Sequence, residues 1–374
     1  MGRSLKVSPG CIEQVKSALG RNGFPSQKAL AEELDIGLST VKKFLTGQPV
    51  DYSYFLEISE RLGYEWRNIV HIDETIPQPI FEESSAFIIG TPITHPRYFF
   101  GRQKELKRLF DLLKRRPLQN AAIIGKRRSG KTSLLHYLKN ITTTPTEQLR
   151  PGQKSDWLPH PENYRWIFVD FQDPRLQSRE GLLRYILECL LKMSVPNPCD
   201  LERFMDVVSS NLRQRTVILL DEIGVGLERC PELDDRFWES LRSLATNQTN
   251  GNLGFVLATP ESPIELARRT GHSSPFFKIF RYNTRTLGAM TEAEARELIA
   301  SSPMPFPAED VEWILTQSKC WPLLLQILCQ ERLFSLEDEE MGDDWQEEGL
   351  KQMQSFDHLF SPLFDLLFEP SLYL

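Results

Sequence analysis

The stretch AAIIGKRRSGKTS, residues 121–133, constrains the fold of this chain more than any other part of its sequence. Gly125 to Thr132 fit the pattern GxxxxGK[ST] without a gap, between a short apolar run and the helical segment TSLLHYL. The glycines let backbone N–H groups turn toward a phosphate, and the N-terminus of the following helix carries a partial positive charge. The sequence therefore predicts a strand, a phosphate-binding loop and a helix, within an α/β domain built on a parallel sheet.

The residues of this loop divide into those that offer backbone N–H groups and those that offer side chains. We expect Lys131 to reach the β- and γ-phosphates of ATP and to assist catalysis, and Thr132 to bind Mg²⁺. ATP and Mg²⁺ are therefore the predicted ligands. The nucleotide contacts expected from the loop are Gly125, Ser129, Gly130, Lys131, Thr132 and Ser133.

A second motif, TVILLDEIG, spans residues 216–224. Its apolar run is typical of a buried strand in a parallel sheet. We expect Asp221, at the carboxyl end of that strand, to hold Mg²⁺ through water, and Glu222 to act as the general base that polarises the attacking water. The alternative interpretation is a strand that ends in a helix cap.

Two further apolar segments, YRWIFVDF and LGFVLATP, predict strands of the same sheet that end at Asp170 and Thr259. Ligand-facing residues lie at the carboxyl ends of strands in such sheets. Thr259 is therefore a candidate sensor of the γ-phosphate. The alternative is a hydroxyl that only closes a turn.

Residues 8–70 read as a bundle of short helices, with Ser8 and Ser26 as caps, Gly20 as a helix end and Asp51 as a helix start. The spacing of Ala31, Val41 and Phe44 is that of a helix-turn-helix of phage-repressor type. A tight turn, DIG at 35–37, separates the two central helices. The candidate DNA contacts are Gln27, Ser39, Thr40, Lys42 and Lys43.

The net charge of −7 means that any contact with DNA comes from a local patch and not from the field of the whole molecule. One copy of this small helical unit should bind weakly and in a salt-sensitive way. Useful affinity then requires a dimer or a larger assembly. A helical protein-interaction domain with the same packing is the alternative.

The sequence predicts four parts: a helix-turn-helix domain (1–72), an extended linker (73–98), an α/β P-loop NTPase core (99–287) and a helical lid with an acidic C-terminal region (288–374). The linker is rich in proline and has no helical period. Its prolines are Pro77, Pro79, Pro92 and Pro96.

Together these motifs resemble the P-loop ATPases of the AAA+/STAND division, over about residues 90–330. In that division an extra strand separates the phosphate-loop strand from the Asp-Glu strand. The element FFGRQKEL matches an aromatic-Gly-Arg-x-x-Glu element of such ATPases, so the resemblance implies that Gly101 and Arg102 lie near the nucleotide. TEAEARELI, with Thr291 and Glu294 as a capping box, and SKCWPLLLQILCQ resemble their lid.

The order helix-turn-helix, tether and ATPase resembles bacterial STAND regulators, which commonly carry long C-terminal sensor repeats. The chain ends at SPLFDLLFEPSLYL without such an array. The expected sensor is then a separate partner or the acidic C-terminal region. Four arginines follow the last core strand where a trans-acting arginine could lie, and none has a specific motif: Arg268, Arg269, Arg281 and Arg285.

Charge is unevenly distributed along the chain. Residues 102–131 are rich in lysine and arginine, whereas SLEDEEMGDDWQEE is strongly acidic. We hypothesise that the acidic stretch 337–348 docks on the basic helix 102–116 in a resting state. Lys126, Arg127 and Arg128, inside the loop, are expected to point away from the phosphates, toward DNA or a neighbouring subunit.

No signal peptide or apolar run of membrane-spanning length is present, and the six cysteines lack metal-ligand spacing. We therefore expect a cytoplasmic protein with reduced thiols and no membrane partner. The leading hypothesis is a slow, regulatory ATPase that self-associates on binding ATP and thereby controls DNA or partner binding. One alternative is a DNA-loading or remodelling ATPase of replication-initiator or transposition-regulator type. A non-hydrolysing DNA-binding adaptor is the other.

Overall fold

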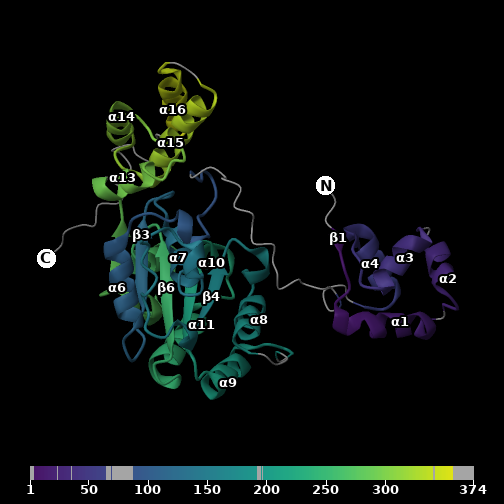
Figure 1. The fold of residues 1–374 in the computed structure, drawn as a ribbon. Coiled ribbons are helices and arrows are strands. Elements are labelled where there is room, and N and C mark those ends of the chain that lie inside the picture. Colours follow the sequence, from purple (N-terminus) through teal and green to yellow (C-terminus); the bar gives the residue numbers. More distant parts are fainter. Residues whose placement is uncertain are drawn as a thin grey trace. The chain divides into compact units, whose positions relative to one another are not determined.

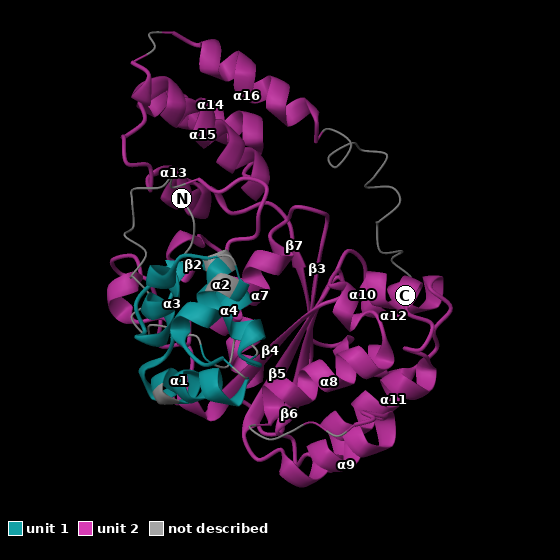
Figure 2. Cartoon of the chain, turned by 90° about the vertical axis from the view of Figure 1, so that its right-hand side faces the viewer, with its two compact units in different colours: residues 1–84 teal, residues 85–374 magenta. Residues whose placement is uncertain are grey.

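The computed structural model describes residues 4–22, 24–34, 36–64, 69, 87–191, 195, 197–339 and 342–356. The chain divides into unit 1, residues 1–84, and unit 2, residues 85–374 (Figure 1 and Figure 2). This boundary lies within the segment predicted as the linker. Asp35, Pro77 and Pro79, which were assigned to turn and linker, lie outside the described residues.

Unit 1 is a small helical unit around one apolar core. Its helices are α1 (Ile12–Arg21), α2 (Gln27–Glu33), α3 (Leu38–Leu45) and α4 (Tyr52–Arg61), with a 3₁₀ turn at Pro9–Cys11. Ala31, Val41 and Phe44 are buried together, as their spacing predicted. Phe44 packs on Phe55 with ring centroids 5.0 Å apart. The presence of short helices and the burial of these three residues agree with the prediction, and the assignment as a helix-turn-helix domain stays a prediction.

Several boundaries in unit 1 differ from the prediction. The Ser26 hydroxyl does cap α2, accepting from the Ala29 N–H at 3.2 Å. A 3₁₀ turn lies between Ser8 and α1, and the Ser8 hydroxyl makes no capping hydrogen bond. The Ser8 N–H donates to the Ile69 carbonyl. Gly20 does not end α1, which continues to Arg21. Asp51 pairs with Ser4 in a two-stranded sheet, β1 (Ser4–Leu5) with β2 (Val50–Asp51), which is too short to leave a sequence pattern.

Unit 2 contains a five-stranded parallel sheet (Figure 1). Its strands are β3 (Ala121–Gly125), β4 (Tyr164–Asp170), β5 (Arg215–Asp221), β6 (Leu253–Thr259) and β7 (Thr284–Leu287). They lie side by side in the order β4-β5-β6-β3-β7. β6 therefore separates the phosphate-loop strand from the Asp-Glu strand, as the family resemblance implied.

Successive apolar side chains of a strand point to opposite faces of the sheet, so both faces must be covered by helices. On β5, Val217 and Leu219 point into one core with α6 and α7, whereas Ile218 and Leu220 point into the other. The first face is covered by α6 (Gln103–Leu113) and α7 (Lys131–Asn140). The second is covered by α8 (Arg179–Leu190), α9 (Leu201–Asn211), α10 (Ile223–Arg229), α11 (Asp235–Ser243) and α12 (Pro263–Arg269).

Short helical turns lie between the main helices and strands of unit 2. The 3₁₀ turns are Pro96–Tyr98, Thr146–Gln148, Pro161–Asn163, Pro174–Leu176 and Pro275–Phe280, and a π-helical turn spans Leu244–Gln248. No helix in the described part of the chain is long and apolar enough to cross a membrane.

Four helices share a core of their own, and we refer to them as the lid segment, or lid: α13 (Glu292–Ile299), α14 (Ala308–Ser318), α15 (Pro322–Glu337) and α16 (Asp344–Gln354). The predicted capping box begins α13, with the Thr291 hydroxyl and the Glu294 carboxylate each accepting from the other residue's N–H. Inside the lid, Arg332 pairs with the buried Asp310 at 2.7 Å. Its guanidinium also lies 5.3 Å from the centre of the Trp345 ring.

The structure does not have the hypothesised contact between the acidic stretch 337–348 and the basic helix. Among the described residues, no ion pair joins that stretch to α6. Figure 1 shows α16 on the lid, away from α6 beside the sheet. The physical reason is that Trp345, buried against Trp313 with ring centroids 5.0 Å apart, fixes α16 on the lid.

The aromatic cluster on the second face yields a stability prediction. Trp238 is fully buried, and its ring contacts are Phe171, Phe237, Phe276 and Phe277. Trp238→Ala should lower the free energy of unfolding of unit 2 by about 3–5 kcal/mol, since it leaves a large cavity. Denaturant unfolding followed by circular dichroism measures this. Tyr282→Ala, at a side chain 85% exposed, should change it by less than about 0.5 kcal/mol. A loss below about 1 kcal/mol for Trp238→Ala would contradict the packing described.

Candidate nucleotide-binding site

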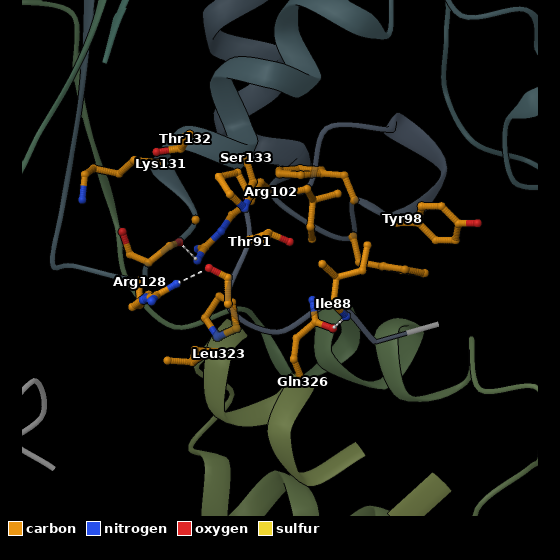
Figure 3. Close-up of a pocket in the computed structure, with 18 of the residues that line it drawn as sticks. Ile88, Thr91, Tyr98, Arg102, Arg128, Lys131, Thr132, Ser133, Leu323 and Gln326 are labelled. Carbon is orange, nitrogen blue, oxygen red and sulfur yellow. Dashed lines mark hydrogen bonds between the residues drawn. The ribbon is translucent and has the colours of Figure 1, made fainter. Parts of the chain in front are cut away.

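A cavity of ≈ 360 Å³ opens in unit 2 beside the phosphate loop (Figure 3). Its lining comes from the loop and the first turn of α7, from residues 88, 90–93, 98–100 and 102, from Gln172 after β4 and Glu222 after β5, and from the lid. The lid residues that line it are Met290, Leu298, Pro322, Leu323 and Gln326. The predicted loop residues Ser129 to Ser133 therefore face a cavity of the size that holds a small ligand.

The glycines of the loop are required by its geometry. Gly130, the residue before α7, has φ +92°, and it caps the helix without a side chain. A Cβ on Gly125 would lie 2.5 Å from the Ser129 hydroxyl and 3.0 Å from the Leu287 carbonyl oxygen. The first N–H groups of α7 are thus left for a ligand, which is the arrangement that binds phosphate.

Lys131 lies folded over the loop. Its ammonium donates to the carbonyl oxygens of Gly125 at 2.8 Å and Lys126 at 3.0 Å. Burial lowers the pKa of Lys131, and the nearby charges of Glu222 and Asp221 act in the opposite direction. The lysine is held by neutral carbonyls, so an anionic phosphate group is a stronger partner for it.

Asp221 and Thr132 form the candidate metal site. Asp221 is 2% exposed, and one of its carboxylate oxygens, Oδ1, has no hydrogen-bond partner. Burial raises the pKa of Asp221 to about 6, and a hydrogen bond from Thr132 opposes this shift. A buried carboxylate oxygen without a partner is costly unless a cation or donor satisfies it. This donor set fits Mg²⁺, which is commonly held by one or two carboxylates together with phosphate oxygens and water.

Glu222 occupies the N-cap position of α10 in a left-handed conformation, φ +50°. Its side chain makes no capping hydrogen bond and lines the cavity. The strand therefore ends at a helix N-cap position, as in the alternative interpretation, but the Glu222 side chain takes no part in the cap, and its catalytic role stays a prediction. Its carboxylate therefore remains available to the cavity beside Asp221.

The predicted Gly101 and Arg102 shape the site from below the lid. Gly101 has φ +72°, and a Cβ there would lie 2.9 Å from Met290 and 3.0 Å from Glu294. Arg102 is 5% exposed and donates to the carbonyls of Ser129 at 3.4 Å, Gly288 at 2.5 Å and Ala289 at 3.2 Å. It lines the cavity, but these hydrogen bonds go to the loop and the start of the lid.

Thr259 is fully buried at the end of β6, beside Ile124 of the phosphate-loop strand. Its hydroxyl donates to the Glu261 carbonyl, and Thr259 is not among the residues that line the cavity. In this structure the hydroxyl closes the turn after the strand. A role as γ-phosphate sensor stays a prediction.

Two sequence-based expectations are wrong in this region. Residues 87–98 were assigned to a linker, but they are packed as part of unit 2. Phe87 is buried in the core of the lid, and Pro96 is buried as well. The Arg128 guanidinium, expected to face DNA or a neighbouring subunit, donates to the Gly90 carbonyl instead, and Arg127 lines the cavity. The apolar run FII at 87–89 was the signal for the first, and it was outweighed by the surrounding prolines.

The candidate DNA residues of unit 1 lie on two helices. Gln27 begins α2 and is half-buried. Ser39, Lys42 and Lys43 are exposed on α3, and Thr40 is half-buried. They lie on positions of α3 other than the buried Val41, Phe44 and Leu45, so a ligand can reach the three exposed side chains.

The four arginines considered for a trans-acting role differ in their contacts. Arg269 pairs with Glu228 at 3.0 Å and Glu261 at 2.8 Å. Arg285 donates to the Thr284 carbonyl of its own strand. Arg268 and Arg281 are exposed, and Arg281 lies beside the exposed ring of Tyr282.

Comparison with known proteins gives the fold of this unit. No protein-family model matches the chain, and no curated protein matches it. A Walker-type ATPase of Pyrococcus abyssi is similar in structure, with a TM-score of 0.51 and 14% identity over 72% of this chain and 76% of that one. Unit 2 therefore has the fold of a Walker-type P-loop ATPase.

Weaker similarities include the ORC2 protein of Aeropyrum pernix, with a TM-score of 0.49 and 14% identity over 68% of this chain and 69% of that one. Domain III of the replication initiation protein DnaA of Thermotoga maritima has a TM-score of 0.44 and 12% identity over 72% of this chain and 95% of that one. Both TM-scores lie below 0.5, so neither similarity carries an argument.

The tight packing at Gly125 yields a prediction about binding. Gly125→Ala should weaken Mg²⁺-ATP binding at least tenfold, about 1.4 kcal/mol, since its Cβ would displace Ser129 and the loop backbone. Calorimetric titration with ATP measures this. Gly288→Ala is the matched control, because a Cβ there meets nothing within 4 Å. Equal affinities for the two variants would show that the loop geometry does not govern binding.

Proposed function

We propose that the protein is an ATP-dependent regulatory switch. It binds Mg²⁺-ATP in the cavity of unit 2 and hydrolyses it slowly. In the ATP-bound state it self-associates, and this controls DNA or partner binding through unit 1. The observation that carries the ATPase part is the unpartnered, buried carboxylate oxygen of Asp221 beside Thr132.

The chain's own residues suggest how the reaction proceeds. Lys131 exchanges its loop carbonyls for the β- and γ-phosphates, where its charge offsets the charge that develops in transfer. Asp221 and Thr132 would hold Mg²⁺, which would supply positive charge to neutralise the phosphates. Glu222 accepts a proton from the attacking water, which adds to the γ-phosphorus as the bond to the leaving ADP oxygen breaks.

Regulation is favoured over mechanical work by the way the site is shared. The cavity is lined by both the core and the lid, so a bound nucleotide contacts both. The arginines that line the cavity are the loop's own Arg127 and Arg128 and the buried Arg102, so an arginine that acts in trans would come from a second copy. Slow hydrolysis in a single copy follows, because such an arginine supplies a large share of the rate in many P-loop enzymes. Arg268 and Arg281 are the exposed candidates for that role in an assembly.

DNA binding by unit 1 is supported by the packing of α2 against α3 and by the exposed Ser39, Lys42 and Lys43. A single α3 offers two cations, so one copy binds weakly. Joining several copies raises the effective concentration of the remaining units once one is bound. A separate sensor or effector protein remains part of the proposal as the source of the signal.

A DNA-loading ATPase is the second candidate, and one observation favours it. The outer face of α6 and the turn after it carry exposed cations for which the structure gives no ion pair: Lys104, Lys107, Arg108, Arg115 and Arg116. Such a face can contact the phosphate backbone. A non-hydrolysing adaptor is the third candidate, and it requires Glu222 to have no catalytic role.

Hydrolysis and assembly separate the three candidates. Glu222→Gln should lower ATP turnover about 100-fold or more, since it removes the general base, while ATP still raises the mass in solution. Phosphate release and light scattering measure the two effects. Glu265→Gln, at an exposed carboxylate on α12, is the control and should leave both unchanged. An unchanged, measurable rate in Glu222→Gln would refute the catalytic assignment. Absence of turnover in the parent chain would favour the adaptor.

Charge removal on two helices locates DNA binding. Lys42→Ala with Lys43→Ala should weaken duplex DNA binding about tenfold and reduce its salt dependence, since two phosphate contacts are lost. Lys107→Ala with Arg108→Ala removes the same charge from α6 and should have little effect. Fluorescence anisotropy with ATP present measures both. The reverse result, together with DNA-stimulated turnover, would favour the loader over the switch.

A further inference from the structure

Residues 87–93, which we call the strap, are held at three points by side chains from three different elements. The Ile88 N–H donates to the Gln326 amide oxygen of α15 at 2.8 Å. The Gly90 carbonyl accepts from the Arg128 guanidinium of the phosphate loop at 2.8 Å. The Ile93 N–H donates to the Ser133 hydroxyl of α7 at 3.0 Å. The strap therefore connects the lid to the phosphate loop.

The strap also forms one wall of the nucleotide cavity. Ile88, Pro92 and Ile93 line it, as do the apolar lid residues Leu298 and Leu323. The phosphate loop, with its N–H groups and Lys131, supplies the polar end of the same cavity. An apolar slot beside an anion-binding loop fits a nucleotide with its base between strap and lid.

Arg128 is the only side chain through which the described loop residues 126–129 hold the strap. Its backbone is left-handed, φ +65°, and Gly90 has φ +89°. Figure 3 shows the Arg128 side chain directed at the strap, with its hydrogen bond drawn. The neighbouring Arg127 also lines the cavity, but the structure gives it no hydrogen bond to the strap.

We propose that Arg128 is a positioning residue that sets the strap as the base-side wall of the site. This inference rests on the proposed function only in taking the ligand to be a nucleotide. Arg128 acts through Gly90 and not on the phosphates. Its loss weakens binding of a ligand that carries a base and spares a ligand made of phosphates alone. The strap continues toward unit 1 in sequence, so the same hydrogen bond joins the phosphate loop to the segment that carries the DNA-binding unit.

The test compares two ligands and two variants of the full chain. Arg128→Ala should raise the Kd for Mg²⁺-ATP about fivefold, the size expected for one charged hydrogen bond at an exposed site, and change the Kd for Mg²⁺-tripolyphosphate by less than about twofold. Arg127→Ala removes the same charge without the strap contact. It should affect the two ligands alike. Gln326→Leu, which frees the strap from the lid side, should give the same pattern as Arg128→Ala.

Hydrogen exchange without any ligand supplies an independent readout. The amides of Ile88 and Ile93 are hydrogen-bonded to side chains, so a displaced strap exposes them. Arg128→Ala should speed exchange in a peptide covering 87–94 at least threefold, whereas Arg127→Ala should leave it as in the parent chain.

Three results would overturn the inference: equal loss of both ligands in Arg128→Ala, no loss of either, or unchanged strap exchange. If the parent chain bound neither ATP nor tripolyphosphate, the proposed function would fail. The exchange measurement would still decide whether Arg128 holds the strap.

Discussion

The buried guanidinium of Arg102 is the interaction on which the arrangement of unit 2 depends. It donates to the carbonyls of Ser129 in the phosphate loop and of Gly288 and Ala289 at the start of the lid. Burial lowers the pKa of Arg102, and the charges of Glu105 and Glu294 offset part of that cost. A buried cation bonded to three carbonyls fixes their positions, because moving any one of them leaves a donor unsatisfied. The distance between loop and lid is set in this way.

The nucleotide site follows from that constraint. Arg102 fixes the loop at the Ser129 carbonyl, and the loop glycines leave backbone N–H groups accessible to a ligand. The Lys131 ammonium donates hydrogen bonds to loop carbonyls. Beyond the loop, Asp221 lies at the carboxyl end of β5, and one of its carboxylate oxygens has no hydrogen-bond partner. A second arginine, Arg150, binds the Phe99 carbonyl and pairs with Glu297 of α13 at 3.1 Å. Arg102 and Arg150 thus join the core to the lid at two points.

The parts of this arrangement that sequence could predict are those governed by local rules. The phosphate loop, the strands ending at Asp170, Asp221 and Thr259, and the capping box of α13 each depend on a few neighbouring residues. The strap was missed because its partners, Gln326 and Ser133, lie far from it in sequence, and its prolines are equally typical of a free linker. The direction of Arg128 was missed for the same reason. Whether a surface cation faces DNA or a backbone carbonyl is decided by tertiary contact.

The cavity is lined by residues of unit 2, and this limits how bound ATP could act on unit 1. A ligand shifts a conformational equilibrium only by contacts that differ between the two states. Every residue that lines the cavity in the described chain belongs to unit 2, from Ile88 onward. In the proposed switch, ATP would therefore have two routes to DNA binding. It can alter the strap, which changes the chain segment leading to unit 1, or it can alter the outer surface of unit 2 and so bring copies together. The second route suits the weak charge of a single α3, since linked copies gain affinity without any change within unit 1. In the first route, the strap would transmit the change through its contacts with the lid and the phosphate loop.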